Sequence, residues 1–229
     1  EQFDLLPPAR RLWRGRTTAC SLGVLEQEVL GIGRGIKDVP GWLIPRIYAH
    51  HLRTGATHDI IRVIYHNAID ILSMVTLATH LLRVYSEPLA KDRSGNDCLR
   101  VALWMDDNGQ NDLAEDAYRA ALDRSLPTSQ QSIALRRLAA FLKRANRRID
   151  ALPLWEQLAD LTRDDPDPCV EMAKYFEWYA GCMQPAVDWT ERALGTVQAW
   201  SSRWRREEQV AALHRRLQRV QKKRDVMLT

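Results

Sequence analysis

The chain has 229 residues, of which 45% are hydrophobic and 27% are charged, an ordinary composition that allows one large or two small globular domains. Its formal net charge of +4 permits a nucleic acid or another acidic partner without requiring one. No apolar run approaches the roughly 18 residues of a membrane span, and no signal peptide is evident. We therefore expect no membrane partner and a cytoplasmic location.

The four cysteines are scattered and form no CxxC pair, and no histidine cluster lies at zinc-finger spacing from them. Reduced, buried thiols of a cytosolic protein are the simplest interpretation. The chain begins with Glu1 rather than methionine, from which we expect a piece of something longer.

The first part, residues 1–88, is punctuated by glycine and proline. It opens with FDLL, a short strand or strand end that Pro7-Pro8 would stop. Three helices are then expected from capping residues and apolar spacing, at residues 21–33, 43–55 and about 59–85. The polar segment 86–97, which contains proline and glycine, is the expected linker.

The second part, residues 98–229, contains an internal repeat. Three segments share one spacing of small and large residues, AEDAYRAAL (114–122), ALPLWEQLA (151–159) and AVDWTERAL (186–194), and each follows another amphipathic segment. This pattern resembles the second helix of a tetratricopeptide repeat (TPR), in which small residues let paired helices approach. We predict about three TPR-like hairpins stacked as a short solenoid, with an irregular helical bundle as the alternative. Pro153 requires its helix to begin near Ala151.

Within the long helix of the first part, the run RVIYHNAIDILSM (62–74) places polar groups on an apolar segment. His66 and Asp70 are four residues apart and share a helix face. A carboxylate binds hard cations and an imidazole can take a proton from an attacking water, as metal-assisted hydrolysis requires. The alternative is a surface contact or a polar pair satisfied in a core.

Four stretches in the first part carry a resemblance: FDLLPPARRLWR, CSLGVLEQEVLG, DVPGWLIPRIYAHHLRTG and YHNAIDILSM. In order and spacing they resemble the C-terminal part of the YprB-like ribonuclease H-like domain, over about residues 1–83. That family belongs to an exonuclease superfamily with four metal-binding acidic residues. The resemblance implies the closing helices of an α/β domain, so the chain is expected to be predominantly α.

The resemblance also implies roles. Asp70 would be the fourth ligand of Mg²⁺ or Mn²⁺, and His66 would occupy the position of the residue that orients or deprotonates the nucleophilic water. No Asp-x-Glu strand motif occurs in the chain, and one carboxylate cannot hold two divalent ions. We therefore expect either the C-terminal portion of a metal-dependent 3′–5′ exonuclease, inactive by itself, or a degenerate relative kept for binding.

The C-terminal helix is strongly basic. Its apolar stripe of Val210, Leu213, Leu217 and Val220 predicts a solvent-facing row of charges. The arginines expected to contact nucleic acid are Arg203, Arg205, Arg206, Arg215, Arg216 and Arg219. A solvated amphipathic helix is the alternative, and a non-catalytic TPR-type scaffold that binds a protein partner is the second functional hypothesis.

Overall fold

The computed structural model describes residues 3–35 and 38–228. The chain divides into two compact units, the first ending at Arg93 and the second beginning at Ser94. Both are predominantly α-helical, and within the described ranges there is no strand beyond an isolated bridge between Arg14 and Thr17. No disulfide joins the four cysteines; Cys98 and Cys169 are buried as expected, whereas Cys20 is partly buried and Cys182 is exposed.

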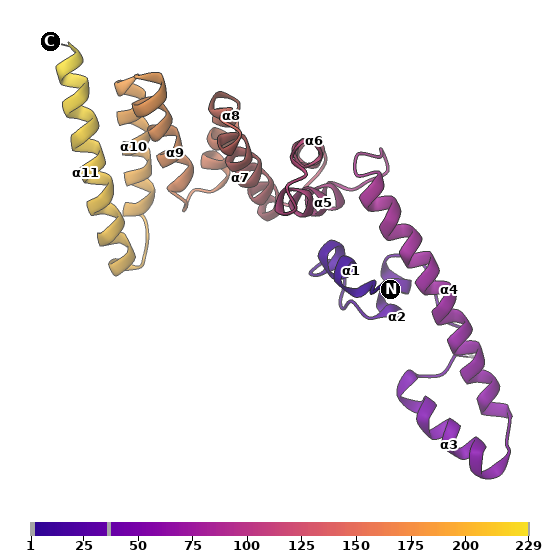
Figure 1. Ribbon diagram of the computed structural model, residues 1–229. Coiled ribbons are helices and arrows are strands. Elements are labelled where there is room, and N and C mark those ends of the chain that lie inside the picture. The colour runs from indigo at the N-terminus through magenta and orange to yellow at the C-terminus, as the bar shows by residue number, and fades with distance from the viewer. Residues whose placement is uncertain (1–2, 36–37, 229) are drawn as a thin grey trace. The chain divides into compact units, whose positions relative to one another are not determined.

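The first unit is built on one long helix with shorter helices beside it (Figure 1). Its elements are α1 (Leu6–Trp13), α2 (Leu22–Glu28), the 3₁₀ turn η1 (Gly41–Leu43), α3 (Ile44–Thr54) and α4 (His58–Ser86). The three expected helices are confirmed. The strand expected in FDLL is wrong, because α1 begins at Leu6 and tolerates Pro7 and Pro8 in its first turn, where a missing N–H costs no hydrogen bond.

Helix α4 has two different faces. One face is buried and includes Val63, His66 and Ser73, with Val63 in a small core beside Val39 and Ile47. The other face exposes large apolar side chains: Ile61, Ile64, Ile71, Leu72, Val75 and Leu82.

By length and composition α4 is apolar enough to cross a membrane, which corrects the expectation that no such segment exists. Core helices of soluble proteins pass the same criterion. The polar side chains of His66 and Asp70 on α4 would be costly in hydrocarbon.

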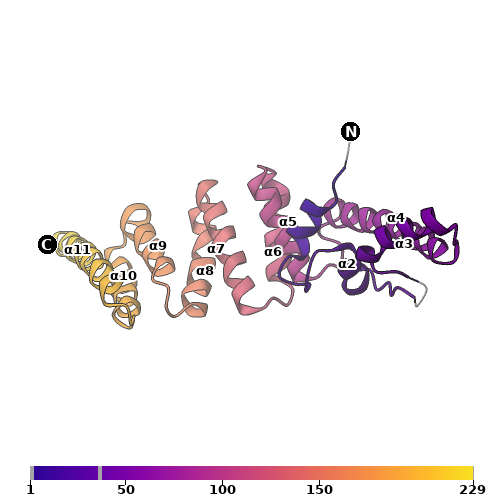
Figure 2. The same ribbon diagram turned by 90° about the horizontal axis from the view of Figure 1, so that it is seen from below.

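The second unit consists of helices packed in sequential pairs (Figure 2). The helices are α5 (Gly95–Asp107), α6 (Asn111–Leu122), α7 (Thr128–Arg144), α8 (Arg148–Leu161), α9 (Asp167–Tyr175), the π-helical turn η2 (Phe176–Ala180), α10 (Met183–Gln198) and α11 (Arg203–Leu228). The three repeat segments lie in α6, α8 and α10. Most of the small and large residues of the repeat are buried: Ala114, Tyr118, Ala121, Ala151, Trp155, Leu158, Ala186, Thr190 and Ala193.

Two details of this unit bear on the sequence predictions. Helix α8 begins at Arg148, so the start expected near Ala151 is wrong, and Pro153 lies inside the helix. The apolar stripe of α11 is confirmed, since Leu213 and Val220 are buried in the core clusters that join α11 to α10.

Candidate functional site

His66 and Asp70 lie one turn apart on the partly buried face of α4. The Nε2 atom of His66 is 3.3 Å from Oδ2 of Asp70, so the predicted shared face is confirmed. His66 is buried, whereas the Asp70 side chain is 32% exposed. Asp70 is thus the member of the pair that remains accessible from outside.

Arg34, from the segment after α2, joins this pair to two further carboxylates. Gly31, with φ of 67°, turns the chain back after α2. Nη2 of Arg34 donates to Oδ1 of Asp70 at 2.5 Å and to Oε1 of Glu26 at 2.8 Å, and Nε donates to Oε2 of Glu26 at 2.6 Å. Nη1 donates to Oδ2 of Asp38 at 3.3 Å. One guanidinium therefore holds three carboxylates, which with His66 form the Arg34 cluster.

Asp38 also contacts the histidine directly. Its Oδ1 atom lies 2.7 Å from Nδ1 of His66. Nδ1 also lies 3.1 Å from Nη1 of Arg34, and the shorter contact to Asp38 favours a proton on Nδ1. A neutral imidazole then has the lone pair of Nε2 on the side of Asp70. This arrangement suits a general base whose tautomer is set by a carboxylate behind it.

The electrostatics of the Arg34 cluster favour the ionised forms of Glu26 and Asp38. Burial raises the pKa of Glu26, but hydrogen bonds from Arg34 and Ser73 outweigh it, so the pKa lies below its usual value. Burial likewise raises the pKa of Asp38, and hydrogen bonds from His66 and Arg34 lower it by more. Hydrogen bonds to Glu26 in turn raise the pKa of Arg34. With His66 neutral, three carboxylates against one guanidinium leave a net charge of −2.

The donor set does not by itself form a divalent-metal site. In the part of the chain that the structure describes, no three His, Cys, Asp or Glu side chains are arranged to hold a metal ion. The carboxylates surround the Arg34 guanidinium instead, at distances typical of charge-assisted hydrogen bonds. Asp70 can offer one oxygen ligand, and further ligands are needed for Mg²⁺ or Mn²⁺ to bind.

Sequence reasoning missed Glu26, Arg34 and Asp38. Glu26 had left a signal, because it falls on the apolar stripe that Leu22 and Leu25 define on α2, where an unpartnered carboxylate is costly. Arg34 had left none, since it lies in GIGRG, which reads as a turn.

The six predicted nucleic-acid arginines fall into two groups on α11. Arg203 pairs with Glu207, Arg205 stacks on the Trp200 ring and Arg206 donates to a backbone carbonyl. The second group, Arg215, Arg216 and Arg219, lies further along the helix, with Arg205 and Arg219 about 21 Å apart at the usual helical rise.

The second group of arginines is tied to a buried acid. Arg216 and Arg219 both bond to Glu177 of η2, and Lys223 joins them at 2.8 Å. The Arg216 side chain is only 14% exposed, so a wholly solvent-facing row of charges is wrong for this residue. Arg215 is exposed, as expected.

The Arg34 cluster lies within the residues that match a known family model. Residues 1–82 match the model of the RNase_H superfamily, which supports an RNase H-like domain there. The chain is also 30% identical, over 226 residues, to the protein named "Uncharacterized protein YprB" of Bacillus subtilis (strain 168). That alignment covers 96% of this chain and 52% of YprB, so the chain spans about half the length of the relative it matches.

Proposed function

We propose that residues 1–88 supply the closing helices of a metal-dependent nuclease domain, and that the complete protein is a 3′–5′ exonuclease acting on nucleic-acid phosphodiesters in the cytoplasm. The observation that carries the proposal is the His66–Asp70 pair, 3.3 Å apart within the region that matches the RNase_H superfamily. A buried imidazole beside an accessible carboxylate suits phosphodiester hydrolysis.

Each residue of the Arg34 cluster has a role in this proposal. Asp70 contributes one ligand to Mg²⁺ or Mn²⁺, which when bound would activate water and stabilise charge on the phosphate. Nε2 of His66 accepts the proton of the attacking water, and Asp38 holds the imidazole through Nδ1. Arg34 and Glu26 position Asp70 through the ion pairs described above.

The exposed apolar face of α4 fits the same proposal. In an α/β domain a helix buries one face on a sheet, and a contiguous apolar face on a folded unit usually marks a contact surface. We propose that the remainder of the RNase H-like domain in the longer protein covers this face and brings the other metal ligands to Asp70.

The test is mutagenesis in a longer protein that contains this chain. Asp70→Asn should abolish metal-dependent cleavage of a labelled oligonucleotide, and His66→Ala should reduce turnover by roughly 10²–10⁴-fold, the range for loss of a general base. Asp59→Asn on the same helix is the matched control, because the Asp59 side chain is half exposed and pairs with Arg62 at the surface. Wild-type rates in both variants, with folding intact by circular dichroism, would contradict the proposal.

A second candidate function is a TPR-type scaffold that binds a protein partner without chemistry. The sequential helix pairs of the second unit and their buried repeat residues favour it. One simple observation distinguishes the two candidate functions. An Asp-x-Glu strand motif in the longer protein supports the nuclease, and its absence supports the scaffold.

A further inference from the structure

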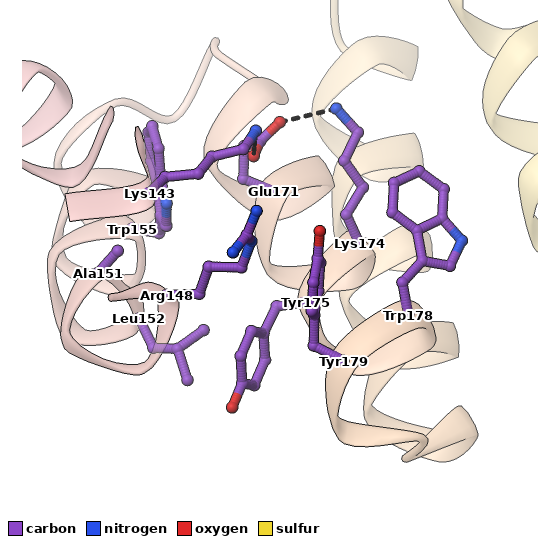
Figure 3. A pocket seen from close by; sticks show the side chains of 10 residues that line it. All are labelled: Lys143, Arg148, Ala151, Leu152, Trp155, Glu171, Lys174, Tyr175, Trp178 and Tyr179. Carbon is purple, nitrogen blue, oxygen red and sulfur yellow. Dashed lines mark hydrogen bonds and ion pairs between the residues drawn. The ribbon is translucent and has the colours of Figure 1, made fainter. Parts of the chain in front are cut away.

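A groove on the second unit is lined by cations and aromatic rings together. It lies between α7 and α8 on one side and α9 and η2 on the other (Figure 3). Lys143, Arg148 and Lys174 provide the charge, and Tyr175, Trp178 and Tyr179 provide the rings. The proposed nuclease site uses none of these six residues.

The rings are presented outward by the π-helical turn η2. Trp178 and Tyr179 are 54% and 57% exposed, although they are adjacent in sequence and large. In this wider turn Glu177 is buried while the two residues that follow it, Trp178 and Tyr179, are exposed, and such π-turns are frequent at functional sites. Tyr175 stacks near Tyr179, with centroids 6.2 Å apart and planes at 19°, and Arg148 lies 4.3 Å above the Tyr179 ring.

Positive charge flanks these rings on both sides. On the α7–α9 side, Lys143 and Lys174 share Glu171 at 2.5 and 2.7 Å, and Arg148 has a buried Nε with no hydrogen-bond partner among the described atoms. On the α11 side, three cations share a single carboxylate, namely Arg216, Arg219 and Lys223 around Glu177. Arg216 also lies 5.4 Å from the Trp178 ring, which links the two sides.

We propose that this groove binds single-stranded nucleic acid, with phosphates on the flanking cations and bases stacked on Trp178 and Tyr179. Six cations against two carboxylates give these two clusters a net charge of +4, which favours a polyanion. An acidic peptide would use the charge but not the two adjacent exposed aromatic side chains, whereas bases stack on such side chains whatever their sequence. The inference concerns binding alone and does not rest on the proposed nuclease activity.

The test uses the 229-residue chain and a fluorescent single-stranded oligonucleotide of about 12 nucleotides, a length within the range of known single-strand sites. Affinity should fall steeply with salt concentration and show little sequence preference. The double variant Trp178→Ala with Tyr179→Ala should weaken binding at least about 10-fold, since base stacking on one ring is commonly worth that much. Lys174→Ala should reduce the salt slope by about one phosphate contact.

The matched controls lie on other parts of the second unit. Trp204→Ala on α11 and Arg119→Ala on α6 alter an exposed ring and an exposed cation of the same unit and should leave affinity unchanged. Circular dichroism checks that every variant folds, and the exposed positions of Trp178 and Tyr179 make this the expected result.

The proposal would be overturned by no binding at low salt, by binding that survives the double variant, or by stronger binding to an acidic polypeptide such as polyglutamate. Loss of binding in Trp204→Ala alone would move the site to the start of α11 and so also overturn it. Because binding is measured without cleavage, failure of the nuclease proposal leaves this result unaffected.

Discussion

Each unit buries one glutamate with arginine, but the two clusters have opposite composition. Glu26 and Glu177 both have side chains with 0% exposure. Around Glu26 a single guanidinium is shared by three carboxylates, and the net charge is −2 with His66 neutral. Around Glu177 a single carboxylate is shared by three cations, and the net charge is +2.

The difference shows that the same arrangement, one buried charged group shared by several opposite charges, can give a cluster of either net sign. A buried charge is tolerated only when it is paired, and a shared central group lets several charges of like sign stay close together. The excess determines what the surface attracts, because the Arg34 cluster favours an additional cation and the Glu177 cluster favours phosphates. The proposed metal ligand Asp70 belongs to the negatively charged cluster, and the proposed nucleic-acid groove borders the positively charged one.

The largest expected effect comes from removing the central group of each cluster. Arg34→Gln leaves three carboxylates facing one another, and Glu177→Gln leaves three cations doing so. Each should lower the free energy of unfolding of its own unit by about 3–5 kcal/mol, the usual loss when a buried ion pair is broken. Hydrogen exchange followed by mass spectrometry measures the two units separately.

The control for this pair is Glu207→Gln. Glu207 makes an exposed pair with Arg203, so the change should cost less than about 0.5 kcal/mol. If the loss of unfolding free energy is spread over both units, or is no larger than in the control, the central groups do not hold the clusters together.

The features that the sequence predicted are those formed between residues close together in the chain. Helix α4 and the repeat helices were predicted because apolar spacing is local, and the His66–Asp70 face because four residues make one turn. The central groups were not, because Arg34 reaches Asp70 across 36 residues and Glu177 meets α11 across 39 to 46. No local pattern encodes such pairs, so nothing in the sequence distinguished Arg216 from an exposed neighbour.

The next largest effect is the dependence of stability on acid pH, which should differ between the two clusters. Burial raises the pKa of Glu177, but hydrogen bonds from Arg219 and Lys223 dominate and lower it to about 2, from an ordinary 4.5. Its stabilising contribution is therefore complete above pH 4.5 and is lost as the pH falls from 4.5 towards 2, by about 3 kcal/mol in all. Wild-type protein and Glu177→Gln should thus converge in stability across this window.

Acidification should also bring Arg34→Gln closer to the wild type, but at a higher pH. Its three uncompensated carboxylates take up protons more readily than in the wild type, which removes their mutual repulsion. The deficit of Arg34→Gln relative to wild type should therefore shrink as the pH falls from 7 to about 5, where Glu177→Gln shows no such recovery. Denaturant unfolding at a series of pH values makes both measurements, and parallel curves for the two variants would contradict the comparison.

A divalent cation should produce a smaller, selective effect. In Arg34→Gln the carboxylates of Glu26, Asp38 and Asp70 are released from the guanidinium, and oxygen donors of this kind suit Mg²⁺ and Mn²⁺. Mn²⁺ at about ten times its dissociation constant would restore roughly 1.4 kcal/mol of stability to the first unit. Wild-type protein, in which Arg34 occupies the centre, should gain nothing, and neither should Glu177→Gln. Equal gains in all three proteins would mean that Mn²⁺ acts elsewhere on the chain.

The smallest expected effect concerns the outer members of each cluster. Lys223→Gln removes one of three cations from Glu177, and since Lys223 is 45% exposed, its pair is screened by water and should contribute less than about 1 kcal/mol. Asp38→Asn keeps an oxygen and an N–H near His66 and Arg34 and lowers the local excess of negative charge, so its effect on stability should be equally small. In the longer protein, however, Asp38→Asn should reduce turnover, because an amide no longer holds the proton on Nδ1 of His66. A large stability loss in either variant would show that these clusters depend on every member rather than on a shared central group. The two units would then differ only in the net charge of their clusters.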